Sequence, residues 1–173
     1  MAEAGMQVLG LDPGFATTGF AVVARSGSNL NAITHGVIRT EPEAPHAVRL
    51  AALYEQIGDL LRAHEPDAVA VERLFFSTNV RTAMAVGQAG GVALAVSAAH
   101  GVPVFEYTPN EVKQAVAGFG SAPKRQVQQM VGAILHLGTI PSPPDAADAC
   151  ALAICHINRS GLARALSKVA AAR

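Results

Sequence analysis

The chain has 173 residues, of which 50% are hydrophobic and 15% are charged, so it can bury a core as one domain and is not a disordered chain. Its 13 basic and 13 acidic residues cancel. Residues 1–72 nevertheless carry a net charge of −5 (four basic, nine acidic), and residues 73–173 a net charge of +5 (nine basic, four acidic). We expect a polyanionic partner to meet the later part of the chain.

Five apolar runs predict strands, at residues 7–12, 18–25, 30–39, 68–72 and 103–107. Residues 26–29, Ser-Gly-Ser-Asn, have the composition of a hairpin turn between the second and third strands. Helical spacing of apolar residues predicts helices at 46–64, at about 79–99 after a cap at Ser77, Thr78 or Asn79, and at 109–117 after a cap at Thr108. Two further helices are predicted at 121–138, with Ser121 as cap, and at 145–159, stopped near Gly161.

The order of these elements predicts the fold class. A meander of three strands followed by strand–helix–strand crossovers indicates an α/β fold with a mixed five-stranded sheet and helices on both faces. Residues 1–160 are predicted to form a single domain. Residues 161–173 are predicted to form a basic, alanine-rich tail that frays.

The two cysteines, Cys150 and Cys155, are five residues apart in one apolar run, which suits neither a disulfide nor a zinc site. We interpret them as buried thiols of a cytoplasmic protein. Residues 82–105 have no charged side chain, but they are rich in alanine and glycine and contain polar residues, so we expect no membrane span. The first six residues include Glu3 and do not match a signal peptide.

Two strands end on an acid: Asp12, which Pro13 and Gly14 follow, and Glu72. If these strands are parallel neighbours, both carboxylates lie at the same edge of the sheet. Asp145 and Asp148 are three residues apart at the start of the last helix and therefore share one face. Singly, each acid has an ordinary explanation, as part of a turn, a surface charge or a partner of the helix dipole.

Together, the four carboxylates indicate a metal site. Two like charges about 4 Å apart repel by roughly 4 kcal/mol at an effective dielectric constant of 20, so a gathered set needs cations. Ligands that are all oxygen select Mg²⁺ or Mn²⁺. A pair of such ions about 3.5–4 Å apart can activate water and stabilise the leaving oxygen of a phosphodiester. We expect two Mg²⁺ ions per subunit, with Mn²⁺ as the alternative.

Seven short motifs follow in order along the chain: Leu-Gly-Leu-Asp-Pro-Gly at 9–14, Val-Glu-Arg-Leu-Phe at 71–75, Gly-Gln-Ala-Gly-Gly at 87–91, Pro-Val-Phe-Glu-Tyr at 103–107, Val-Lys-Gln at 112–114, Gly-Ser-Ala-Pro-Lys at 120–124 and Asp-Ala-Ala-Asp-Ala at 145–149. With them, the chain resembles the RuvC family of Holliday-junction resolvases over about residues 6–160. The resemblance implies a ribonuclease H-like fold and a homodimer. It also implies Mg²⁺-dependent, paired symmetric nicking of four-way DNA junctions in recombination and repair.

The same resemblance assigns the catalytic role to Asp12, Glu72, Asp145 and Asp148. It implies RuvA and RuvB, the branch-migration proteins, as partners.

Phe75 and Phe76 follow Glu72 in a polar neighbourhood. Exposed aromatic side chains beside such a site can stack on unpaired bases, whereas packing in the core is the alternative for one of the two. The resemblance gives Phe75 the base-stacking wedge role, with Phe76 as a second candidate.

Lys113 and Lys124 flank the flexible segment 118–120, and the resemblance makes them phosphate or active-site contacts. Their alternative is a solvated helix face. Arg81 and Asn79 are further candidates for DNA contact. Each phosphate contact is expected to steepen the salt dependence of binding.

The helix at about 79–99 is rich in glycine and alanine, which indicates close approach of another backbone. This neighbour is either the sheet of the same chain or the second copy in a two-fold dimer, and the resemblance supports the dimer. The six histidines are scattered, and we interpret them as structural or surface residues.

Three other functions remain open from the residues. The chain could be a junction-binding module that does not cut, a ribonuclease H-like RNA-processing nuclease, or an ATP-binding domain of the actin and sugar-kinase kind.

Overall fold

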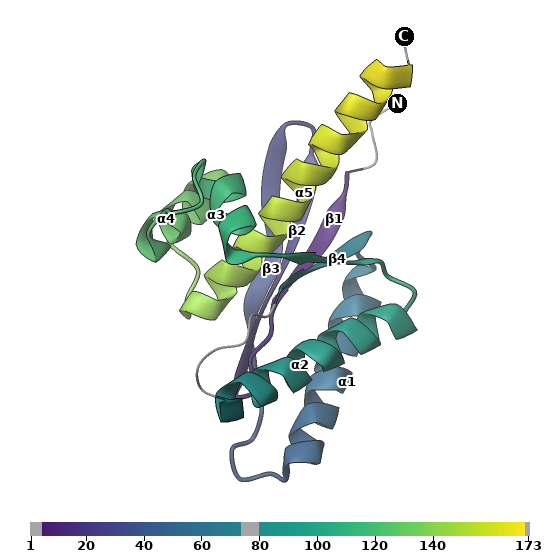
Figure 1. The fold of residues 1–173 in the computed structure, drawn as a ribbon, viewed down its shortest axis with the longest axis vertical. Coiled ribbons are helices and arrows are strands. Elements are labelled where there is room, and N and C mark those ends of the chain that lie inside the picture. The colour runs from purple at the N-terminus through teal and green to yellow at the C-terminus, as the bar shows by residue number, and fades with distance from the viewer. Residues whose placement is uncertain (1–4, 74–79, 172–173) are drawn as a thin grey trace.

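The structure is a computed structural model that describes residues 5–73 and 80–171. These residues form one sheet of five strands: β1 (Gln7–Asp12), β2 (Thr17–Ser26), β3 (Asn29–Arg39), β4 (Ala68–Glu72) and β5 (Val104–Tyr107). The strand order is β3-β2-β1-β4-β5 (Figure 1). The first three strands pair antiparallel, whereas β4 pairs parallel with β1 and β5 parallel with β4. The predicted mixed sheet is therefore confirmed.

Helices cover both faces of the sheet (Figure 1). On one face, α1 (His46–His64) and α2 (Val80–Ala99) bury apolar side chains such as Ile57 and Val96 against β1, β2 and β4. On the other face lie α3 (Pro109–Ala117), α4 (Lys124–Ile134) and α5 (Pro144–Ala171). Two hydrophobic cores therefore enclose the sheet, and β1 contributes to both because its residues are apolar on both faces.

The boundaries of the elements follow the predictions closely until α4. The bounds of α1 and α3 are as predicted, and Thr108 caps α3 in a capping box with Glu111. The predicted helix at 121–138 is wrong at both ends. Its N-cap is Pro123 rather than Ser121, and α4 stops at Ile134 because His136 adopts a left-handed backbone conformation with φ 54°.

The predicted stop of the last helix near Gly161 is also wrong, since α5 continues to Ala171. A glycine within a helix costs about 1 kcal/mol relative to alanine, and good helix formers on both sides can outweigh that cost. Residues 161–171 therefore extend the helix, where the sequence had predicted a separate tail.

The two cysteines are buried, as predicted. Cys150 and Cys155 are buried free thiols on α5, and burial raises the pKa of each to about 12. Among the helices of the described residues, none combines the length and the apolar character needed to cross a bilayer.

Candidate active site

The carboxyl ends of β1 and β4 place two of the predicted acids side by side. Leu11 pairs with Val71 in the parallel ladder, and each strand ends one residue later, at Asp12 and at Glu72. Both side chains are half-buried. The acid that ends each apolar strand thus lies at one edge of the sheet, as predicted.

Two glycines bring the first turns of α5 against the same part of the sheet. A Cβ atom at Gly10 would lie 2.0 Å from the carbonyl oxygen of Ala149, and one at Gly19 would lie 2.0 Å from the carbonyl oxygen of Asp145. Real side chains do not tolerate such distances, so only glycine permits this approach of helix to sheet. Neither glycine is predicted from the sequence to have a role in the site. A glycine inside a core strand, such as Gly10, is the sequence signal that could have indicated this close approach of the helix.

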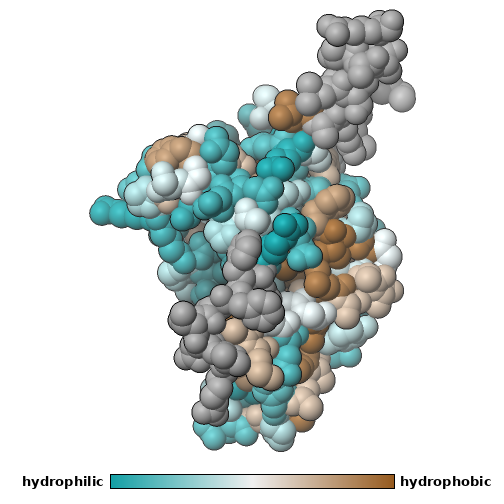
Figure 2. Space-filling model, viewed as in Figure 1, coloured by the Kyte–Doolittle hydropathy of each residue, from teal (hydrophilic) through white to brown (hydrophobic). Residues whose placement is uncertain are grey.

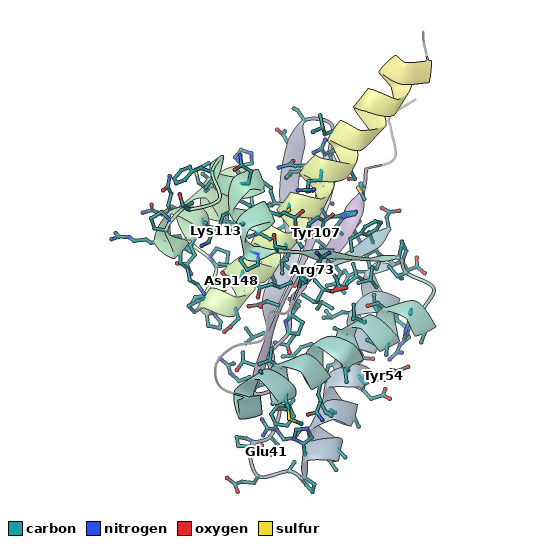
Figure 3. The ribbon with its side chains drawn as sticks, viewed as in Figure 1. Glu41, Tyr54, Arg73, Tyr107, Lys113 and Asp148 are labelled. Carbon is teal, nitrogen blue, oxygen red and sulfur yellow. The ribbon has the colours of Figure 1, made fainter. Side chains whose placement is uncertain are left out.

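As a result, all four acids line one pocket of ≈ 370 Å³. The pocket lies where the start of α5 meets α3, α4 and the ends of β1 and β4, and Figure 3 shows Lys113 and Asp148 on this side of the molecule, far from Glu41 and Tyr54. The remaining lining residues are two cations and a wall of apolar side chains: Lys113, Lys124, Pro109, Val112, Val127, Ala151 and Leu152. Three segments far apart in the sequence therefore converge here, as predicted.

The pocket is electrostatically unfavourable for its own carboxylates. Burial, followed by the charges of Glu72, Asp148 and Asp145, raises the pKa of Asp12 to about 7. Burial and the charge of Asp148 also raise the pKa of Glu72. Carboxyl groups that resist ionisation in this way are typical of functional sites, because a bound ligand can offset the repulsion between their charges.

The two lysines offset part of this negative charge. Nζ of Lys124 lies 2.6 Å from Oδ2 of Asp148, and this contact is the main reason why the pKa of Lys124 is raised. Lys124 also lowers the pKa of Asp12 and of Glu72, and Lys113 lowers that of Glu72. Both predicted lysines thus line the pocket.

The donor set fits a hard divalent cation. Every acid in the pocket offers carboxylate oxygens, the ligands that Mg²⁺ and Mn²⁺ prefer, and the raised pKa of Asp12 marks negative charge that the lysines do not fully balance. Within the described chain, however, no three histidine, cysteine, aspartate or glutamate side chains stand close enough together to hold one ion. The carboxylates therefore share a pocket but need side-chain movement to become a ligand set.

Some predicted DNA contacts cannot be placed. Phe75, Phe76 and Asn79 lie outside the described residues, and the side chain of Arg81, near the start of α2, is likewise not described. Arg73, directly after Glu72, is exposed, and its backbone N–H donates to the carbonyl oxygen of Tyr107. Both residues are labelled in Figure 3. Arg73 lines a second pocket of ≈ 420 Å³ beside β5, and none of the four predicted site acids lines that pocket.

The loop that follows Asp12 is held by contacts that no sequence pattern indicated. The hydroxyl of Thr18 donates to the carbonyl oxygen of Gly14 at 2.8 Å, and that of Thr40 donates to the carbonyl oxygen of Phe15 at 2.8 Å. The guanidinium of Arg49 lies 4.0 Å from the centre of the Phe15 ring. These partners are 4 to 34 residues away along the chain, so only the fold shows that they stiffen this loop.

The chain and its fold are similar to those of known proteins. The family model of crossover junction endodeoxyribonuclease RuvC matches residues 8–156. The RuvC proteins of Pelotomaculum thermopropionicum and Rubrobacter xylanophilus are 52% and 54% identical over 151 and 149 residues; the matches cover 87% and 86% of this chain and 92% and 83% of those proteins. The Thermus thermophilus RuvC structure in complex with a Holliday junction substrate is 38% identical, with a TM-score of 0.87, over 91% of this chain and 96% of that chain.

Proposed function

The chain belongs to the RuvC family of crossover junction endodeoxyribonucleases, and we propose that it resolves Holliday junctions by paired, symmetric, metal-dependent nicks during recombination and repair. Its fold is the ribonuclease H-like fold of that family. The observation that carries the proposal is the convergence of Asp12, Glu72, Asp145 and Asp148 in one pocket. In this chain, those four acids are the residues to which the proposal assigns catalysis.

The cofactor in this proposal is Mg²⁺, with Mn²⁺ as the alternative and two ions per subunit. The four carboxylates would hold the ions, which supply an activated water and a counter-charge for the leaving oxygen. This assignment is supported by the oxygen-only donor set and by the raised pKa values of Asp12 and Glu72.

The chain's own residues have further tasks in the reaction. Lys113 and Lys124 bind the oxygens of the phosphate that enters the pocket, because an ammonium group donates to phosphate from any of three N–H bonds. Val112, Val127 and Leu152 form an apolar wall of the pocket and keep water from that side. The negative carboxylates would otherwise repel the phosphate, so the two lysines are needed for DNA to approach them.

Outside the pocket, the proposal assigns Phe75 to stacking on an unpaired base at the junction, with Phe76 as the second candidate. Arg81 and Asn79 are assigned to contacts with the DNA. The sequence supports the assignment of Phe75, since Phe75 follows Glu72 by three residues and Glu72 lines the pocket. The branch-migration proteins RuvA and RuvB are the proposed partners, and the cytoplasm is the proposed location.

A homodimer belongs to the proposal, because two symmetric nicks need two sites. One face of α2 supports it: Gly87 and Gly91 are exposed, and a Cβ atom at either would meet nothing within 4 Å. On the same face, Met84 and Leu94 are 62% and 37% exposed. Figure 2 shows hydrophobic side chains gathered beside β5 and the later half of α2. The glycines therefore do not serve packing against the described part of their own chain.

The test is cleavage of a synthetic four-way junction in the presence of Mg²⁺. We expect paired nicks at symmetric positions on two opposed strands, and no cutting of a linear duplex of the same sequence. The Asp12→Asn variant should bind the junction with wild-type affinity but should not cut it, because it keeps the fold and loses one ligand.

Intact junctions at every Mg²⁺ and Mn²⁺ concentration, with binding retained, would show instead a module that binds without cutting. Preferential cleavage of RNA would favour an RNA-processing nuclease. Loss of junction binding in Asp12→Asn would mean that Asp12 has a structural role.

A further inference from the structure

An ion pair occupies the acidic pocket. The Lys124 ammonium contacts Oδ2 of Asp148 at 2.6 Å, close enough for a charge-assisted hydrogen bond. Asp148 is one of the four acids that line the pocket, so a cation already neutralises part of the proposed ligand set. A carboxylate held in this way has less electron density to offer a second cation, and a metal ion beside it would repel the ammonium.

The lysine is the partner that can move. Its side chain is 61% exposed, whereas that of Asp148 is 30% exposed. Asp148 projects from α5 next to Ala147 and Ala149, which are 1% and 0% exposed and fix the helix against the sheet. Lys124 is the first residue of α4, and its ammonium group lies at the end of a flexible four-carbon side chain. Rotation of this side chain breaks the pair without displacing any buried element.

We propose that Lys124 is an exchangeable counter-ion, which pairs with Asp148 in the metal-free protein and transfers to a phosphate of the bound junction, so that Asp148 becomes free to bind the cation. The inference rests on the proposed function, because it needs both the cation and the junction. Since binding effects are reciprocal, the junction then tightens cation binding and the cation tightens junction binding by the same factor.

Lys113 provides the matched control. It lines the same pocket, and within the described residues it takes part in no ion pair. A Lys113→Met substitution therefore removes the same charge from the same pocket but leaves the Lys124–Asp148 pair in place. Any effect of charge alone should appear in both variants, and the exchange should be lost only in Lys124→Met.

The experiment is calorimetric titration of Ca²⁺ into the wild type, Lys124→Met and Lys113→Met, each with and without a synthetic four-way junction that is checked afterwards for cleavage. Without DNA, Lys124→Met should bind Ca²⁺ about three- to fivefold more tightly than the wild type does, because Asp148 is already free. The junction should tighten Ca²⁺ binding at least about threefold more in the wild type than in Lys124→Met. Lys113→Met should keep the wild-type factor.

A second measurement uses only the wild-type protein, so it does not depend on whether a variant folds. In ¹⁵N NMR spectra of the wild type without DNA, the Lys124 ammonium signal should change when Ca²⁺ saturates the site, since the pair with Asp148 breaks. An unchanged signal, or the same coupling factor in the wild type and in Lys124→Met, overturns the exchange but leaves the proposed function intact. Failure of the wild type to bind either Ca²⁺ or the junction overturns both.

Discussion

At the scale of single residues, the protonation of Asp12 affects the stability of the protein. Burial and three neighbouring acids raise its pKa from 3.8 to about 7, so the folded chain keeps a proton at pH values where the unfolded chain has lost it. Between those two values, the unfolding free energy of the metal-free protein falls as the pH rises, by about 1.4 kcal/mol per pH unit. The raised pKa of Glu72 acts in the same direction.

We therefore expect the wild type, in the presence of a chelator, to lose roughly 2 kcal/mol of stability between about pH 5 and about pH 7 through Asp12. Asp12→Asn cannot ionise, so its stability should change less over this interval and should exceed that of the wild type at the higher pH. Urea unfolding of both proteins at both pH values measures the difference. Equal changes in the unfolding free energy of the two proteins would mean that the folded chain does not raise the pKa of Asp12.

At the scale of elements, the contact between α5 and the sheet assembles the site. The carbonyl oxygen of Asp145 lies 2.0 Å from the position that a Cβ atom on Gly19 would take, so Gly19 sets the distance of the first turn of α5 from β2. Because Asp145 and Asp148 belong to this part of α5, their position depends on a backbone contact. Gly19, which does not line the pocket, thus holds these two pocket carboxylates in place.

Gly19→Ala should destabilise the protein by about 1–3 kcal/mol, as overpacking does. It should also reduce junction cleavage by about 100-fold in the protein that remains folded, because a displacement of about 1 Å misplaces two carboxylates. Urea unfolding and cleavage rates at saturating junction measure both effects. Gly36→Ala is the matched control: its Cβ would meet only the Phe20 ring, at 3.1 Å, and a ring can shift. Equal effects of the two substitutions would contradict the positioning role of Gly19.

At the scale of the whole molecule, the proposed homodimer makes a prediction about the outward face of α2. A helix with Gly87 and Gly91 exposed in open space forgoes about 0.5–1 kcal/mol per glycine relative to alanine. A second copy that brings its backbone close to this face would explain the two glycines, because a larger side chain would prevent that approach. The same face carries the exposed Met84 and Leu94, which a partner would cover.

We expect the double variant Gly87→Gln/Gly91→Gln to remain folded, because both positions are exposed and a Cβ atom at either would meet nothing within 4 Å in the described part of the chain. The variant should weaken dimerisation at least about tenfold. Sedimentation equilibrium measures the dimer constant, and thermal unfolding at low concentration checks the fold. Ala51→Gln, an exposed substitution on α1, should leave the dimer constant unchanged. A double variant that dimerises like the wild type would place the two-fold contact elsewhere.

The sequence alone determined most of the element boundaries and the identity of the four acids. Strand and helix periodicity, the Thr108 cap and an acid at the end of two apolar strands are local features, and local features can be read in order along a chain. The end of α4 was mispredicted because a left-handed residue at His136, and not a glycine or proline, terminates the helix.

Only the tertiary structure decided how the acids behave. The raised pKa of Asp12, the Lys124–Asp148 pair and the close approach allowed by Gly10 and Gly19 all depend on distances between segments that are far apart in sequence. Desolvation and charge interactions vary with burial and separation in space, which no spacing along the chain specifies.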